Sequence, residues 1–283
     1  MTIRRSQKGI LVKKPLLFTI ATILLLVFSI PAGAHMLWLN PMEYYPAVGS
    51  TVDIGIGWGH TYPAERIDQE VKADRVEAIA AIDPDGRTVP LVQAAADRYQ
   101  LKIEKAGAYV VTARIKPGFF TMTPDGRKWG DKKEIANAVN CTNFHIEAKA
   151  VLIAGGDAKN LDAGSDQALT LVPLTDPGAI KAGGTFAATV LYNNQPLADA
   201  PLKAVYAGFE PKKEDGHKTS DKGHSHSGGH YPVETRTDAQ GRVEISVDRP
   251  GYWLVILSHK PDYPDRDICD EYMYNVTYTL EVR

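Results

Sequence analysis

"TVDIGIGW", residues 51–58, alternates hydrophobic side chains with small or polar ones. This is the pattern of a half-buried β-strand, because side chains that are two positions apart point to the same face. Turn sequences rich in glycine, proline, asparagine and aspartate separate similar runs along the chain. These runs are VEAIAAI, YQLKIE, AYVVTARI, FHIEAKAVLI, TFAATVLY, LKAVYAGF, VEISV, YWLVILS and MYNVTYTLEV. The sequence therefore predicts an all-β fold made of antiparallel β-sandwiches.

A weak internal repeat predicts two such modules. Residues 83–115 and 237–259 share the same order: a turn that ends in Gly-Arg, a strand, a glycine turn and an aromatic-rich strand. Each unit is typical of the closing half of an immunoglobulin-like or transthyretin-like sandwich. We place one module at residues 35–155 and the other at 165–283, joined by the glycine-containing linker between them. Only residues 132–140 offer a turn or two of helix.

The first 34 residues have the organisation of a cleaved export signal. Residues 4–14 are basic, Leu16–Ile30 are almost entirely apolar, and Ala32-Gly33-Ala34 forms a small-residue cleavage site. An apolar run of about 15 residues is shorter than the roughly 20 that a membrane-spanning helix needs. We therefore expect a periplasmic protein that begins at His35 and has no membrane span after cleavage.

The composition excludes some classes of partner but does not settle whether the two cysteines form a disulfide. The net charge of −2 argues against nucleic acid or an anionic membrane surface as the partner. Cys141 and Cys269 can pair in an oxidising compartment, and two free or metal-bound thiols are the alternative.

Several motifs, taken in order, resemble one family over nearly all of the chain after the signal. They are AHMLWLNP, GWGHTYP, AIDPDGR, AGAYVVTARIKPG, LTLVPLTDPGAIKAGGTF, NNQPLADAPLKAVYAG and TDAQGRVEISVDRPGYWLVILSHK. The sequence is similar to the DUF4198 family of periplasmic proteins linked to nickel and cobalt uptake systems. The resemblance implies metal capture outside the inner membrane in support of a metal permease.

His35 and His60 are the candidates for a tight metal site. Cleavage after Ala34 would leave His35 with both an α-amine and an imidazole, which together can close a chelate ring on a divalent ion. His60 follows the first strand, where neighbouring glycines leave room for an ion. Nitrogen ligands suit nickel and cobalt, the first choices here, and also zinc and copper.

A second set of candidates lies in HKTSDKGHSHSGGHYP, a segment without an apolar core pattern. Histidine-rich tracts of this composition are typical of metal binding, and we expect weaker binding here because the segment must be ordered first. The candidates are His217, His224, His226 and His230. His259, at a predicted strand end, is a further candidate, and His145 is a weaker one. The acidic run DYPDRDICDE lacks a recognised calcium-loop spacing and is predicted to be a solvated loop.

No nucleophile elbow, phosphate-binding loop, HExxH or Rossmann glycine pattern occurs, so we do not predict an enzyme. Two alternatives to a metal-uptake protein stay open. One is a metal-free β-sandwich module that binds a protein or a glycan. The other is a copper histidine-brace oxidase, in which His35 and His60 would be joined by Tyr44, Tyr45 or Tyr62.

Overall fold

The computed structural model describes residues 36–59, 62, 73–156, 158–163, 167–209 and 231–283 of the 283-residue chain. The predicted export signal lies outside these residues. The described residues belong to one compact unit. They form seventeen strands and two short 3₁₀ helices, η1 (Ala73–Arg75) and η2 (Pro177–Ala179), so the predicted all-β sandwich fold is confirmed.

The stretch at residues 51–58 lies in β2 (Thr51–Gly59), within a four-stranded antiparallel sheet. Val52, Ile54 and Ile56 are buried on one side of this strand, as the alternation predicts. The strand order is β1-β2-β6-β5, and we call this the first sheet. Its other strands are β1 (Met36–Pro41), β5 (Leu91–Ala95) and β6 (Arg98–Lys102).

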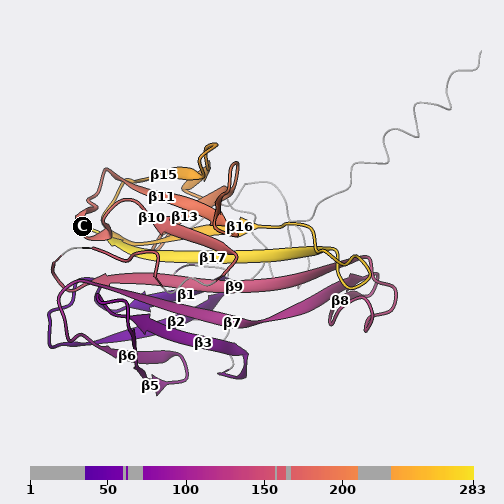
Figure 1. The fold of residues 1–283 in the computed structure, drawn as a ribbon, viewed down its shortest axis with the longest axis horizontal. Coiled ribbons are helices and arrows are strands. Elements are labelled where there is room, and N and C mark those ends of the chain that lie inside the picture. The colour runs from indigo at the N-terminus through magenta and orange to yellow at the C-terminus, as the bar shows by residue number, and fades with distance from the viewer. Residues whose placement is uncertain (1–35, 60–61, 63–72, 157, 164–166, 210–230) are drawn as a thin grey trace, which may run out of the picture. The chain divides into compact units, whose positions relative to one another are not determined.

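The largest sheet, which we call the central sheet, contains strands from both halves of the sequence (Figure 1). Its order is β14-β13-β16-β17-β9-β7-β3-β4, with β8 paired to β7. β17 and β9 run parallel, which the sequence patterns did not predict, while the other pairs are antiparallel. Its strands are β3 (Val76–Ile82), β4 (Thr88–Val89), β7 (Ala108–Thr123), β8 (Gly126–Trp129), β9 (Asn140–Ile153), β13 (Pro201–Tyr206), β14 (Val233–Arg236), β16 (Gly251–His259) and β17 (Glu271–Val282).

A third, smaller antiparallel sheet is built around β11 (Gly184–Tyr192). β10 (Leu169–Pro173) and β15 (Arg242–Val247) pair with β11 along its two edges, and β12 (Gln195–Pro196) forms a short hairpin with its end. The segment that we predicted as the linker between two modules lies between β9 and β10.

The two faces of β9 supply two different hydrophobic cores. Ile146 and Leu152 pack with residues of β1 and β2 in the first core. Val151 and Ile153 pack with residues of β10, β11 and β15 in the second core. Because alternate side chains of a strand point to opposite faces, a strand that is covered on both sides reads as a nearly continuous hydrophobic run. This explains the apolar run AVLI, residues 150–153, at the end of β9.

Buried hydroxyls fasten β1 onto β17. Thr277 Oγ1 donates to the carbonyl oxygen of Leu37 at 2.6 Å, and Thr279 Oγ1 donates to that of Leu39 at 2.8 Å. Each bond gives a buried hydroxyl the partner that it needs in an apolar environment. The start of the described chain is thereby tied to its last strand.

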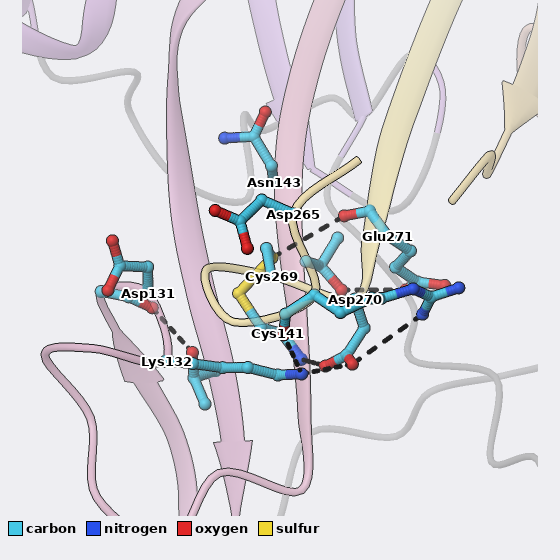
Figure 2. Close-up of a disulfide and its surroundings, with 12 residues drawn as sticks. Asp131, Lys132, Cys141, Asn143, Asp265, Cys269, Asp270 and Glu271 are labelled. Carbon is cyan, nitrogen blue, oxygen red and sulfur yellow. Dashed lines mark hydrogen bonds and ion pairs between the residues drawn. A yellow bond between two sulfur atoms is a disulfide. The ribbon is translucent and has the colours of Figure 1, made fainter. Parts of the chain in front are cut away.

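Cys141 and Cys269 form a disulfide, so of the two alternatives from the sequence the bridged one is confirmed (Figure 2). It joins the first part of β9 to the segment before β17, with 4.9 Å between the α-carbons. The carboxylate of Asp270 strengthens this junction, since it accepts from the Cys141 amide at 2.8 Å and pairs with Lys132. The Lys132 and Arg266 cations and the Cys141 amide lower the pKa of Asp270 against the opposing effect of its burial.

Residues 132–140 form turns rather than a helix. The carboxylate of Asp131 accepts from the amides of Lys133 and Glu134, and Ile135 N bonds to Asp131 O at 3.0 Å, which completes one helix-like turn. Asn137 then adopts a φ of 58°, and this left-handed conformation prevents the helix from continuing. No helix among the described residues is long and apolar enough to cross a membrane.

Candidate functional site

Most of the predicted metal ligands fall outside the described residues. They are His35, His60, His217, His224, His226 and His230. His259 is described, as is the weaker candidate His145. Within the described part of the chain, no three side chains among histidine, cysteine, aspartate and glutamate are grouped so that they could hold a metal ion.

His259 is the last residue of β16 and is half-buried. Its ring meets Tyr192 edge-on, with 4.7 Å between the ring centroids. Burial lowers the pKa of the imidazole, which favours the neutral form. The side chain lies on the same face of β16 as Trp253, Val255 and Leu257, which belong to the second core.

A third hydrophobic cluster lies on the opposite face of β16, and we call it the edge cluster. Its buried members are Trp38, Tyr62, Val205, Leu254 and Ile256, and its partly buried members are Met36, Phe209 and Tyr231. Trp38 and Tyr62 meet edge-on with 5.8 Å between their centroids. Lys203 places its ammonium 4.6 Å from the centroid of Tyr231, a cation–π contact.

Four members of the edge cluster are close in sequence to predicted histidine ligands. Met36 directly follows His35 and is the ladder partner of Gly59, which directly precedes His60. Tyr62 is two positions after His60. Phe209 and Tyr231 are the described residues on either side of the segment with four histidines. Described residues next to three separate parts of the sequence that contain candidate ligands therefore belong to one cluster.

A glycine makes the packing of this cluster possible. Trp38 lies across β2 so closely that a Cβ on Gly57 would be 1.9 Å from the indole Nε1. No other residue fits there without displacement of the ring, so Gly57 fixes where Trp38 can lie. The glycines of GWG, which the sequence suggested as space for an ion, thus have a packing role at Gly57.

The three tyrosines considered as a third copper ligand differ in their surroundings. The Tyr45 hydroxyl is within hydrogen-bonding distance of the carbonyl oxygens of Glu281 and Pro177, at 2.8 and 3.1 Å. Tyr44 and Tyr62 are buried, and burial raises the pKa of both hydroxyls. Both hydroxyls therefore stay protonated near neutral pH. Of the three tyrosines, Tyr62 alone belongs to the edge cluster.

The acidic run at residues 262–271 is largely engaged within the protein. Arg266 pairs with Asp262 at 2.8 Å, and the carboxylate of Asp265 accepts from the Asp267 amide at 3.0 Å. Glu271 accepts from the hydroxyl of Thr142 at 2.9 Å. These contacts hold the loop next to the disulfide.

A row of rings crosses the central sheet on the face that carries the second core. His145 on β9, Tyr274 on β17 and His259 on β16 are direct ladder partners, so their side chains share one face. His145 stacks on Tyr274 with 4.8 Å between the centroids. Beside His145 lie Arg114 and Glu77, which the sequence did not single out because single charged residues on separate strands carry no motif.

The profile of a family described as a domain of unknown function, DUF4198, matches residues 32–261. The chain belongs to the DUF4198 family. The matched range contains β1, all members of the edge cluster, and both His145 and His259, whereas Tyr274 lies beyond it. No curated protein matches this DUF4198 chain.

Among solved structures, the D0-D1 domain of intimin is 10% identical, covers 87% of this chain and 96% of its own, and gives a TM-score of 0.23. The fibronectin(III)-like modules of Clostridium thermocellum CbhA are 11% identical, with coverages of 84% and 92% and a TM-score of 0.19. Salmonella alpha-2-macroglobulin reacted with methylamine is 13% identical, with coverages of 88% and 15% and a TM-score of 0.19. At such TM-scores these likenesses carry no argument.

Proposed function

We propose that this DUF4198 protein is exported to the periplasm, binds a divalent transition metal there and supports an uptake system for that metal. Nickel or cobalt is the metal we expect first, with zinc and copper as the alternatives. An inner-membrane metal permease is the expected recipient. The family resemblance and the histidine content of the sequence are the starting points of this proposal.

The edge cluster is the observation that carries the proposal. Met36 and Gly59 are ladder partners, and α-carbons of such partners are about 4.5–5.5 Å apart. The residues that flank this pair in the sequence are His35 and His60. Consecutive α-carbons are only about 3.8 Å apart, so we expect these two histidines to reach a common ion.

The same cluster also contains the described neighbours of the histidine-rich segment. Tyr231 directly follows His230 in the sequence, and its ring packs in the same cluster as Met36. We therefore propose two binding modes at one place. A tight site would use the His35 amine and imidazole with His60, and the histidines at 217–230 would gather ions at lower affinity, because their binding must also order the backbone.

The affinity of the proposed tight site depends on the free N-terminal amine of His35. An additional residue before His35 would move the α-amine away from the imidazole and open the chelate ring. We expect the processed protein to bind Ni²⁺ or Co²⁺ more tightly than a form that retains Ala34. Isothermal titration of both forms measures this difference, and native mass spectrometry of the exported protein gives the mature N-terminus and the bound metal. Equal affinities would contradict the proposed chelate.

Two further variants separate the binding modes. Deletion of residues 217–230 should lower the number of weakly bound ions and leave the tight site, whereas His60→Ala should weaken the tight site. His259 is itself a candidate from the sequence but lies on the face of β16 opposite to the edge cluster, so we expect His259→Ala to leave the tight site unchanged. A loss of tight binding in this variant would assign His259 to that site. Weak binding should also fade below about pH 6, where free imidazoles become protonated. If the deletion removes all metal binding, the assignment of tight binding to His35 and His60 is wrong.

A further inference from the structure

A pocket opens beside His145, on the face of the central sheet that carries the second core. Its volume is about 320 Å³. Five parts of the chain line it: β3, β7 next to its bulge after Ile115, β9, the residues just before β10, and β17. The lining residues are Glu77, Arg114, Pro117, His145, Gln167, Ala168 and Tyr274. Of the two described histidines, His145 lines the pocket and His259 does not.

The imidazole of His145 is held in one tautomer by Asn143. Asn143 Nδ2 donates to the carbonyl oxygen of Gly118 at 3.1 Å, which fixes the orientation of the amide. Its Oδ1 lies 2.7 Å from His145 Nε2 and can only accept, so Nε2 must be the protonated nitrogen. A neutral His145 therefore keeps its lone pair on Nδ1, as a hydrogen-bond acceptor.

One wall of the pocket is aromatic. Tyr274 stacks against one face of the His145 ring, and Tyr272 stacks in turn on Tyr274 with 5.4 Å between the centroids. Tyr274 and Tyr272 belong to β17, on one side of β9, whereas Arg114 and Pro117 belong to β7 on the other side. The second face of the imidazole is therefore turned toward the polar wall of the pocket. Because Tyr274 stacks against one face of the His145 ring, the ring is held in place, and its other face can contact a ligand with little loss of side-chain entropy.

The opposite wall carries one positive and one negative charge. Arg114 Nε lies 3.6 Å from Glu77 Oε2, and both side chains retain contact with solvent. This ion pair places one positive and one negative charge side by side in the wall. The carboxylate of Glu77 can accept hydrogen bonds from a ligand, and the amide of Gln167 can both accept and donate them.

We propose that this pocket binds one ring of a neutral saccharide. Hydroxyl groups both donate and accept, so they suit a site that presents an imidazole lone pair, a carboxylate and an amide. The C–H groups on one face of a sugar ring can stack on the free face of the His145 imidazole. A volume of about 320 Å³ is at the lower end of ligand pockets, which fits a ring of this size rather than a large cofactor. The proposal is independent of the metal site.

The binding experiment uses the purified exported protein and isothermal titration with maltose, cellobiose and N,N′-diacetylchitobiose. Glucuronate and glucosamine serve as charged probes. We expect at least one neutral sugar to bind and to bind better than both charged ones. The proposal is overturned if no neutral sugar binds at about 10 mM, a limit that includes even weak sites, or if a charged probe binds best.

Three variants and one matched control locate the site. Arg114→Gln, His145→Ala and Gln167→Ala should each weaken sugar binding by about tenfold or more. His259→Ala removes the imidazole on the other side of Tyr274, outside the pocket, and should leave the affinity unchanged. Circular dichroism and thermal unfolding check the fold of each variant. Gln167 is half-buried and lies before β10, so Gln167→Ala can still test the site if the other two variants do not fold. Unchanged affinity in folded pocket variants would overturn the assignment.

Two further measurements test the His145 tautomer and distinguish the sugar site from the metal site. Long-range ¹H–¹⁵N NMR should show His145 protonated at Nε2, and a ring protonated at Nδ1 would contradict the hydrogen-bond argument. Sugar binding should persist after the protein is treated with EDTA, whereas metal binding is lost. A sugar response that disappears with the metal would belong to the metal site and would overturn the present proposal.

Discussion

Two half-buried imidazoles, those of His145 and His259, couple the protonation of the protein to its stability. Burial lowers the pKa of both, and for His145 the nearby carboxylate of Glu77 partly opposes this. Near the ordinary histidine pKa of about 6.5 the unfolded chain therefore binds more protons than the folded protein. Stability is then complete above that pH and is lost as the pH falls through the lower pKa values of the folded state.

We expect the free energy of unfolding to fall as the pH is lowered below about 6.5, the ordinary pKa of histidine. A His145→Gln/His259→Gln double variant should show a shallower fall, because both proton-linked contributions are gone. Urea unfolding at a series of pH values measures both slopes. Carboxylates with a lowered pKa, such as Asp270, act only at lower pH and do not interfere. Parallel slopes in the two proteins would contradict this prediction.

The sequence could predict single residues only where a pattern marks them. Val52, Ile54 and Ile56 stand out by alternation, and the histidine-rich segment stands out by composition. The pocket at His145 could not be predicted, because Glu77, Arg114 and Gln167 come from three separate segments. Strand pairing brings the strands of Glu77 and Arg114 together, and Gln167 comes from the segment before a different sheet. The partner of His145 likewise depends on tertiary structure, since Asn143 is oriented by Gly118 on the neighbouring strand.

At the scale of the element, β2 is a strand whose two inner glycines have different surroundings. A Cβ at Gly57 would lie 1.9 Å from Trp38 Nε1, whereas a Cβ at Gly55 would find its nearest neighbour, Asn40 O, at 3.7 Å. The first contact is impossible without displacement of the indole, and the second is an ordinary van der Waals contact. The strand therefore tolerates a methyl group at only one of the two positions.

Gly57→Ala is expected to destabilise the protein by about 1–3 kcal/mol, because the added methyl group would overlap with the indole of Trp38 and overpack the site. Gly55→Ala, the matched control, should be neutral or stabilising by about 0.4–1 kcal/mol, because it restricts the unfolded chain. Chemical denaturation of the two variants gives both values. Tryptophan fluorescence should change for Gly57→Ala alone, as Trp38 moves. Equal stability of the two variants would mean that the indole can move without cost.

The disulfide acts on a long stretch of chain between β9 and β17. Its cysteines are 128 positions apart in the sequence. In the chain-entropy model a loop of this length stabilises the folded state by about 5 kcal/mol, and measured effects are often smaller. The double variant Cys141→Ala/Cys269→Ala should therefore lower the free energy of unfolding by roughly 2–5 kcal/mol. Urea unfolding with and without reductant measures this, and the variant should not respond to reductant.

Strand positions were predictable from local patterns, but strand pairing was not. The parallel pairing of β17 with β9 joins segments from opposite ends of the sequence. No local signal distinguishes it from an antiparallel pair, because both faces of each strand are buried for much of their length. The possible helix at residues 132–140 is instead a single turn, since Asn137 adopts a left-handed conformation.

At the scale of the whole molecule, β9 connects the parts of the fold. Ile146 and Leu152 belong to the first core, while Val151 and Ile153 belong to the second core. β17, from the end of the sequence, pairs with β9 along nine consecutive register positions. Loss of either core would expose one face of β9, and loss of β17 would also leave a β9 edge unpaired, so the two cores should stabilise each other.

We therefore expect the protein to unfold in a single transition although it contains two separate hydrophobic cores. Differential scanning calorimetry should give a calorimetric enthalpy equal to the van't Hoff enthalpy. Residues 35–155 produced alone would keep β7 and β9 but would lack β17 and the third sheet, which leaves Val151 and Ile153 uncovered. We expect this fragment to lack a sharp unfolding transition. Two resolved transitions in the whole chain, one of them reproduced by the fragment, would show instead that each half folds independently around its own core.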